Sequence, residues 1–207
     1  MNKPRVIDIE ARRLDTGSEA GEYDPGSKLL HWSIALAVLA MLVFGFYLDT
    51  LAFSEGKVAL IQQHKSSGMV LALFMLFRIA RRARHGFLPS TENRRGFRSL
   101  AARGVHVLLL LLPVGMVVSG VLRSLAYGRS VKVFGAEFIP AVMEKNDQLH
   151  AVASDAHAVI AWLLLACIAM HVTAALWHHF VTRDETLRRM LPGRSSKPSA
   201  ALAEIAR

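Results

Sequence analysis

The chain has 207 residues, of which 53% are hydrophobic, and its 25 Lys and Arg against 16 Asp and Glu give a net charge of +9. Its mean hydropathy of +0.33 is high for a chain with this many charged side chains, so charged and apolar residues must be segregated along the sequence. Cys167 is the only cysteine, which excludes an internal disulfide, a cysteine-ligated zinc site and a cysteine-ligated iron–sulfur cluster.

Four apolar stretches follow a polar N-terminal segment, residues 1–26, which predicts a flexible cytoplasmic tail. The stretches cover residues 29–48, 58–80, 104–122 and 157–180. Each is near the roughly 20 residues that a helix needs to cross a bilayer. We therefore predict an all-α integral membrane protein, a four-helix bundle over residues 27–190, followed by a second cytoplasmic tail over 191–207.

The loop between the second and third stretches fixes the expected orientation. Its arginines are Arg81, Arg82, Arg84, Arg94, Arg95, Arg98 and Arg103. The loop between the first two stretches has Lys57 as its only basic residue. Because basic loops stay on the cytoplasmic side, the protein is expected to cross its membrane four times with both termini in the cytoplasm. The positive charge is thus a topology signal and does not indicate nucleic-acid binding.

Four of the nine histidines lie in the apolar stretches at two matching depths. His31 and His171 lie toward the cytoplasmic side, whereas His64 and His157 lie toward the outer side. Ionisable side chains within a span are costly to insert and usually face the bundle interior with a partner. The topology therefore predicts an inner pair, His31 with His171, and an outer pair, His64 with His157.

The fourth stretch carries one member of each pair, at the two ends of "HAVIAWLLLACIAMH". A step of fourteen residues along an α-helix turns through about 1400°, close to four full turns, and rises about 21 Å. The rings of His157 and His171 are therefore expected to project from nearly the same helix face at two levels of the membrane.

Haem is the ligand that two neutral imidazoles in lipid suit best. Zinc sites need three or four protein ligands, and the sequence offers no carboxylate or thiolate at these depths. Haem iron already has four macrocycle nitrogens, so two imidazoles complete its coordination. A flat macrocycle needs small neighbours one helical turn from each ligand. Those neighbours are Ser27, Ala35, Gly68, Ala153, Ala161, Cys167 and Ala175, with Leu60 as the exception.

The other histidines have several interpretations. His106, near the inner end of the third stretch, is equally compatible with a contact to the inner haem's edge, a quinone contact and a buried hydrogen bond. His178 and His179 lie where the fourth stretch leaves the membrane. For them, interfacial capping is favoured over contact with haem propionates or a quinone headgroup. We expect His85 and His150 to lie in loops.

Five segments, in the same order along the chain, resemble the prokaryotic cytochrome b561 family. They are "YDPGSKLLHWSIALAVL" at 23–39, "QQHKSSGMVLALFMLFRIARR" at 62–82, "LLLLPVGMVVSG" at 109–120, "VKVFG" at 131–135 and "DAHAVIAWLLLACIAMHVTAALWHHFVTRDETLRRMLPG" at 155–193. The resemblance implies two b-type haems whose axial ligands are His31, His64, His157 and His171. One departure is the start of the third stretch, where family members commonly have a His and then an aromatic residue, and this chain has Ala102 and His106.

The family resemblance implies a transmembrane electron carrier that exchanges electrons with quinone. Some family members oxidise superoxide, and here Arg123, Arg129 and Lys132 offer an outer positive patch that could steer a small anion. Four acidic residues in the same region weaken that case, namely Glu137, Glu144, Asp147 and Asp155.

Two other functions are compatible with the sequence. One is an electron-transfer subunit that serves a soluble dehydrogenase or a periplasmic redox protein. The other is a haem-free membrane anchor whose histidines only form hydrogen bonds between helices. Direct oxidation of NADH is not expected, because the sequence has no glycine-rich dinucleotide-binding motif.

Overall fold

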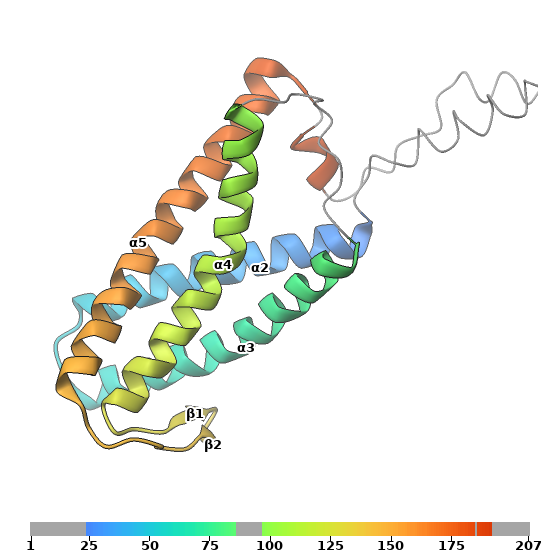
Figure 1. The fold of residues 1–207 in the computed structure, drawn as a ribbon. Helices are drawn as coiled ribbons and strands as arrows, with labels where there is room; N and C mark the ends of the chain where they lie inside the picture. The colour runs from blue at the N-terminus through green and yellow to red at the C-terminus, as the bar shows by residue number, and fades with distance from the viewer. Residues whose placement is uncertain (1–23, 86–96, 185, 192–207) are drawn as a thin grey trace, which may run out of the picture. The chain divides into compact units, whose positions relative to one another are not determined.

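The computed structural model describes residues 24–85, 97–184 and 186–191, which form four long helices and one short hairpin (Figure 1). The elements are α2 (Pro25–Thr50), α3 (Glu55–His85), α4 (Phe97–Ala126), β1 (Val131–Val133), β2 (Ala136–Ile139), α5 (Asp147–Trp177), the π-helical turn η2 (His178–Thr182) and the 3-10 turn η3 (Arg188–Met190). A larger compact unit contains the described residues 30–85 and 97–174, and a smaller one contains 24–29, 175–184 and 186–191. All four paired histidines belong to the larger unit.

Side-chain caps fix the start of three helices outside their apolar stretches. Asp24 accepts hydrogen bonds from the backbone and hydroxyl of Ser27 at 2.9 and 2.8 Å and precedes Pro25, the first residue of α2. Ser54 caps α3 through the Lys57 amide, and Asn146 caps α5 through the Leu149 amide. The helix that carries His157 and His171 therefore begins ten residues before the predicted span, at Asp147.

The core of the larger unit draws on all four helices. Its buried residues are Ile34, Val38 and Leu42 of α2, Met75 of α3, and Ala161 and Leu164 of α5. Leucines of α4, with Met116, pack against this cluster. The opposite helix faces expose large apolar side chains, for example Leu36, Leu73 and Trp162, each more than 60% exposed. An apolar outer surface of this kind suits a lipid environment, because lipid tails are as apolar as these side chains.

Among the described residues, three helical segments are long and apolar enough to cross a membrane, namely Pro25–Thr50, Leu100–Ala126 and Asp147–Thr182. They contain the predicted spans over 29–48, 104–122 and 157–180. The predicted span over 58–80 lies within α3, which is 31 residues long but is not among the three. Its first half contains Gln62, Gln63, His64 and Lys65, which lower its mean hydropathy. The fourth span therefore stays a prediction.

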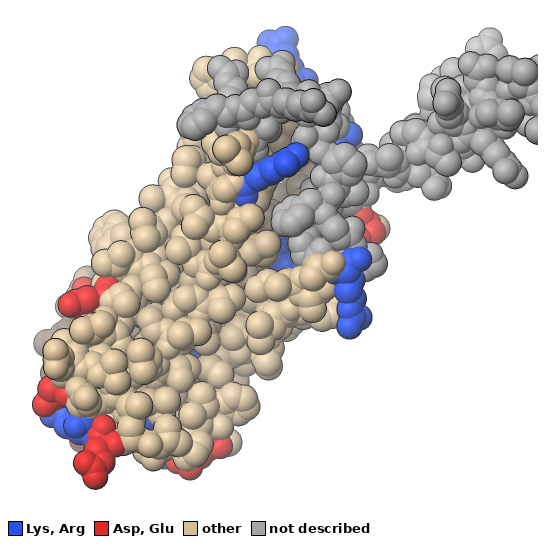
Figure 2. All heavy atoms as spheres, in the orientation of Figure 1, with Lys and Arg blue, Asp and Glu red and all other residues tan. Residues whose placement is uncertain are grey.

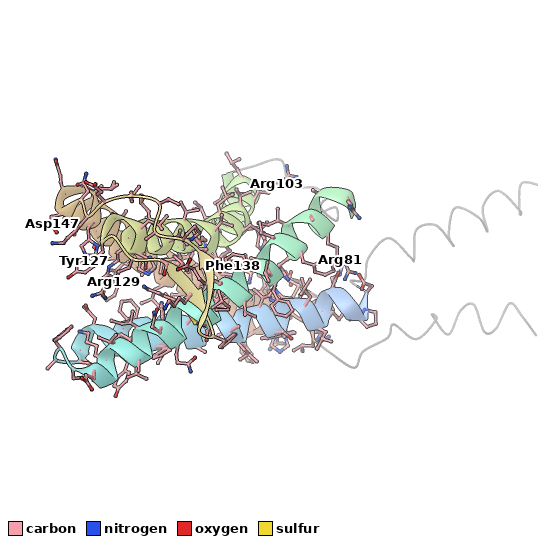
Figure 3. The ribbon with its side chains drawn as sticks, turned by 90° about the horizontal axis from the view of Figure 1, so that it is seen from below. Arg81, Arg103, Tyr127, Arg129, Phe138 and Asp147 are labelled. Atoms are coloured by element: carbon pink, nitrogen blue, oxygen red, sulfur yellow. The ribbon has the colours of Figure 1, made fainter. Side chains whose placement is uncertain are left out.

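Charged side chains gather toward the ends of the helices. In Figure 2 the visible surface over α4 and α5 is largely uncharged, and acidic and basic side chains cluster near the hairpin end. In the larger unit, Figure 3 places Arg81 and Arg103 at the end of the helices opposite to Tyr127 and Arg129. Of the predicted arginine loop, Arg94 and Arg95 lie outside the described residues.

A two-stranded hairpin between α4 and α5 is an addition to the predicted all-α fold. β1 and β2 pair antiparallel, with Lys132 opposite Glu137, and their turn places Phe134 and Gly135 at φ of 48° and 90°. Glycine adopts a positive φ without strain, and here it takes the larger of the two. The Phe134 amide donates to the hydroxyl of Ser66, which is 3% exposed, at 2.9 Å. This bond anchors the hairpin against α3.

Candidate functional site

The inner pair lies between α2 and α5. The ring centroids of His31 and His171 are 6.4 Å apart, and their planes make an angle of 72°. A metal–imidazole bond is about 2 Å long, so two axial imidazoles on one metal place their ring centroids about 6 Å apart. The separation of these two rings therefore fits a metal held between them, as haem ligation requires.

His106 joins the inner pair from α4. Its ring meets that of His171 edge-on, with centroids 5.3 Å apart. The structure thus puts this residue beside a predicted ligand, which the sequence could not establish. Trp32, the neighbour of His31 on α2, packs edge-on against that ring at 5.5 Å, so aromatic rings surround the inner pair.

Arg78 is an inner-site residue that the sequence analysis missed. Its Nη2 donates to Nδ1 of His31 at 3.1 Å. Because a guanidinium only donates, Nδ1 of His31 is the acceptor and the proton of the neutral ring lies on Nε2. The inner pair thus fits a metal by separation, but ligation through Nε2 of His31 requires Arg78 to move and the proton to pass to Nδ1. The signal in the sequence was that Arg78 is a charged residue within the predicted span over 58–80, near the depth of His31.

The outer pair lies between α3 and α5. His64 and His157 are close enough for their charges to interact. Nδ1 of His157 is 2.9 Å from the hydroxyl oxygen of Ser119 on α4. Nδ1 of His64 is buried and has no hydrogen-bond partner within the described part of the chain. An orphaned buried nitrogen is costly, and a bound water or ligand would satisfy it.

Two glycines that the sequence analysis did not single out lie against the outer rings. A Cβ atom at Gly45 of α2 would be 3.3 Å from Cε1 of His64. One at Gly120 of α4 would be 3.3 Å from Cε1 of His157. Both contacts are tighter than an ordinary van der Waals contact, so these helices approach the rings as closely as they do because neither residue has a side chain.

The small residues predicted around the ligands differ in burial. Ala153 and Ala161, one turn on either side of His157, are 2% and 8% exposed, and Cys167, one turn before His171, is 6% exposed. Ala35 and Gly68 are half-buried, as are Ser27 and Ala175 in the smaller unit. Small side chains therefore face the interior most consistently along α5, beside the outer ring.

A pocket of about 540 Å³ opens at the hairpin end of the larger unit, between the start of α3 and the hairpin. Gln62, Lys65, Arg129, Lys132 and Glu137 supply its charged and amide groups. The side-chain oxygen of Gln62 is buried and has no hydrogen-bond partner among the described residues. Three cations against one carboxylate make the pocket suited to an anion.

Arg123, the third predicted cation, lies near the outer pair. It is close enough to His64 and His157 for their charges to interact, although it does not line the pocket. Its side chain is exposed, and its backbone carbonyl accepts from Nδ1 of His150 at 2.9 Å. His150, expected in a loop, instead lies in the first turns of α5.

One of the four acidic residues is paired with a lysine, and a second lies opposite a lysine in the hairpin. Asp147 forms an ion pair with Lys145 at 2.8 Å, and its hydrogen bond raises the pKa of that lysine. Glu137 lies opposite Lys132 in the hairpin. The negative charge on this side is therefore partly compensated without Lys65 or Arg129.

In the smaller unit, His178 and His179 lie in the turn that follows α5. Nδ1 of His178 donates to Oδ2 of Asp184 at 2.5 Å. Burial raises the pKa of Asp184, but hydrogen bonds from Thr186 and His178 outweigh it and lower the pKa to about 2. The bond from His178 is thus lost only in strong acid, as the pH falls through this value. The ring of His179 packs edge-on against Phe180 at 4.8 Å. The hydrogen bond from His178 to Asp184 is compatible with the interfacial capping predicted for this residue.

Comparison with known proteins gives one consistent result. The family model described as prokaryotic cytochrome b561 matches residues 22–193. The chain is 34% identical to cytochrome b561 homolog 2 of Escherichia coli (strain K12), an alignment that covers 82% of this chain and 90% of the relative. It is 25% identical to cytochrome b561 homolog 1 of the same organism, over 80% and 94%. It is also 28% identical to the probable superoxide oxidase CybB of Yersinia pestis, over 62% and 73%.

Proposed function

Because the chain belongs to the prokaryotic cytochrome b561 family of haem b-binding membrane electron-transfer proteins, we propose that it holds two b haems and carries electrons between outer and inner membrane levels. His64 and His157 would be the axial ligands of the outer haem, and His31 and His171 those of the inner haem. When bound, each haem supplies one-electron redox chemistry at an iron held by two imidazoles.

The separation of the inner rings carries this proposal. A centroid distance of 6.4 Å agrees with the distance of about 6 Å expected for two axial imidazoles, and edge-on ring packing also falls in this range. The outer pair supports it through the orphaned nitrogen of His64 and the glycines against both rings.

One cation lies beside each pair, and we assign each a role toward the haem carboxylates. Arg78 would leave Nδ1 of His31 and pair with a carboxylate of the inner haem. Arg123, within charge range of both outer rings, would do the same at the outer level. A carboxylate paired with arginine forms a strong hydrogen bond that is often bidentate and therefore directional.

In the proposed topology the protein lies in a bacterial inner membrane, α3 is the fourth span, and both termini lie on the cytoplasmic side. The exposed apolar residues in the second half of α3, such as Leu73, Phe74 and Phe77, support contact with lipid there. The polar first half would face the bundle and the outer pocket, where Gln62 and Lys65 lie. Polar residues within a span are tolerated on such faces.

Quinone is the proposed electron acceptor, and superoxide is the candidate donor. The relative named as a probable superoxide oxidase and the cationic outer pocket favour superoxide. Two superoxide anions would give up one electron each and leave as two O₂ molecules. Quinone would take these two electrons with two protons and become quinol. Two one-electron centres thus connect a one-electron donor with a two-electron acceptor.

Neutralising the outer cations should slow superoxide oxidation. The triple variant Arg123→Gln, Arg129→Gln, Lys132→Gln is expected to lose about tenfold or more in rate at low ionic strength, because steering of a small anion raises association rates by 10- to 1,000-fold. The rate should also lose its dependence on salt. Stopped-flow measurement of superoxide consumption across a range of ionic strengths tests both expectations.

The matched control removes two other cations near the outer surface. Lys57 donates to the Leu51 carbonyl and Lys145 pairs with Asp147, and neither lines the pocket. The double variant Lys57→Gln, Lys145→Gln should keep most of the rate. An unchanged rate and salt dependence in the triple variant, with its haem content intact, would exclude superoxide steering by these residues.

The experiment that tests the proposed function as a whole combines spectroscopy with turnover. The detergent-purified chain should give a reduced-minus-oxidised spectrum of b-type haem and a count of two haems per chain. Reduced protein should then be reoxidised by added quinone. A colourless protein would instead support the haem-free anchor and overturn the proposal.

The alternative is an electron-transfer subunit for a soluble dehydrogenase or a periplasmic redox protein. The exposed cations at the outer end favour it as a docking surface for an acidic partner. A redox protein that copurifies with the chain, together with no superoxide-dependent reduction, would support this alternative. Turnover with superoxide by the isolated chain would contradict it.

A further inference from the structure

Ser119 lies at the contact between α4 and the outer pair. It is 6% exposed, and its hydroxyl oxygen is 2.9 Å from Nδ1 of His157 on α5. It belongs neither to the predicted ligands nor to the charged groups of the pocket. A buried hydroxyl beside a predicted ligand can act on haem only through that ligand.

The hydrogen bonds of Ser119 determine which nitrogen of His157 carries the proton. The hydroxyl oxygen lies 2.8 Å from the Gly115 carbonyl and 3.0 Å from the Met116 carbonyl, and these oxygens can only accept. The single hydroxyl proton is therefore used within α4. The remaining contact must be a bond in which Nδ1–H of His157 donates to the Ser119 oxygen, which leaves the lone pair on Nε2.

The backbone of α4 also approaches this ring closely at Gly120, the residue after Ser119, where an added Cβ atom would lie 3.3 Å from Cε1 of His157. By contrast, Nδ1 of His64 has no partner in the described residues, and Nδ1 of His31 accepts from Arg78. His157 is thus held ready to bind a metal through Nε2, unlike those two rings.

We propose that Ser119 is a positioning residue that fixes the tautomer and ring plane of His157 and thereby lowers the reduction potential of the outer haem, an inference that rests on the proposed function. An acceptor on the second nitrogen makes a ligating imidazole a stronger donor to the metal. A stronger donor stabilises the ferric state over the ferrous state. Loss of the hydroxyl should therefore make the outer haem easier to reduce.

The test compares the reduction potentials of Ser119→Ala and the wild-type holoprotein by spectroelectrochemical titration. We expect one of the two reduction potentials to rise by about 59 mV, which is about a tenfold change in the equilibrium constant for one-electron reduction. The low-spin ferric EPR signal of the same haem should change, because its ligand plane is less fixed. Ser119→Thr, which keeps the hydroxyl, should restore the lower potential.

Ser124→Ala is the matched control, since Ser124 is a serine of the same helix that is 5% exposed. It should leave both potentials unchanged. Equal shifts in Ser119→Ala and Ser124→Ala, or unchanged potentials and EPR signals in Ser119→Ala, would overturn the inference.

His157→Ala separates this failure from a failure of the proposed function. If His157→Ala loses one haem and Ser119→Ala leaves the reduction potential of the outer haem unchanged, only the positioning role of Ser119 is wrong. If the wild-type chain binds no haem, or the His157→Ala protein keeps both, the proposed function itself is wrong.

Discussion

Replacing His157 or His171 with alanine is expected to halve the haem content of the purified protein. Each substitution removes one axial nitrogen from one pair, and the other pair lies about 21 Å away along the same helix. The two levels should therefore lose their haems independently. A haem count and the amplitude of the reduced-minus-oxidised spectrum measure the loss, and the double variant should lose both haems.

His150→Ala is the matched control, because it removes a third histidine of α5 outside the pairs. Its ring donates to the Arg123 carbonyl and packs on Tyr127, with centroids 5.0 Å apart. We expect it to keep both haems. If His157→Ala and His171→Ala keep two haems each, the pairs are not the ligands. If both haems disappear in each single variant while the protein stays folded, the two levels are coupled.

Gly120→Val should displace the His157 ring and remove the outer haem without changing a ligand. The first carbon of any side chain at this position would lie 3.3 Å from Cε1 and 3.6 Å from Nδ1 of that ring. Valine adds two more carbons, and overpacking of this kind usually costs about 1–3 kcal/mol. We therefore expect one haem per chain, with the spectrum of the inner haem retained.

Gly104→Val provides the control on the same helix. A Cβ atom at Gly104 would meet nothing within 4 Å, so this variant carries the helix-propensity change of valine without the steric one. It should keep two haems. Gly45→Val, which crowds His64 from α2, should behave like Gly120→Val. A normal haem content in both crowded variants would contradict the proposed position of the outer haem.

Much of the fold and the pairing of the histidines could be predicted because each depends on a local signal. Hydropathy located the apolar stretches, and the arginine loop set their direction, so His31 and His171 could be assigned to one depth. The structure places these two rings together, and their role as haem ligands stays a prediction. Membership of the cytochrome b561 family, expected from five segments, is confirmed over residues 22–193.

Other parts of the site depend on contacts between distant segments. The contact of Ser119 and Gly120 with His157 depends on how α4 is rotated about its axis, which the apolar run around them does not determine. The bond from Arg78 to His31 joins residues 47 positions apart. The hairpin was missed because its strands have three and four residues, too few to show a period of two.

α5 runs without a break from Asp147 to Trp177 and carries a histidine of each pair, so it also sets the electrical distance between the two levels. A separation of about 21 Å is about two thirds of a hydrocarbon core about 30 Å thick. One elementary charge crossing a whole membrane at 100 mV changes in energy by about 2.3 kcal/mol, so an electron between these levels changes by about 1.5 kcal/mol. In a bacterium whose interior is negative, inward electron movement works against the membrane potential. The proposed electron transfer is therefore electrogenic, and its rate would fall as the membrane becomes more strongly energised.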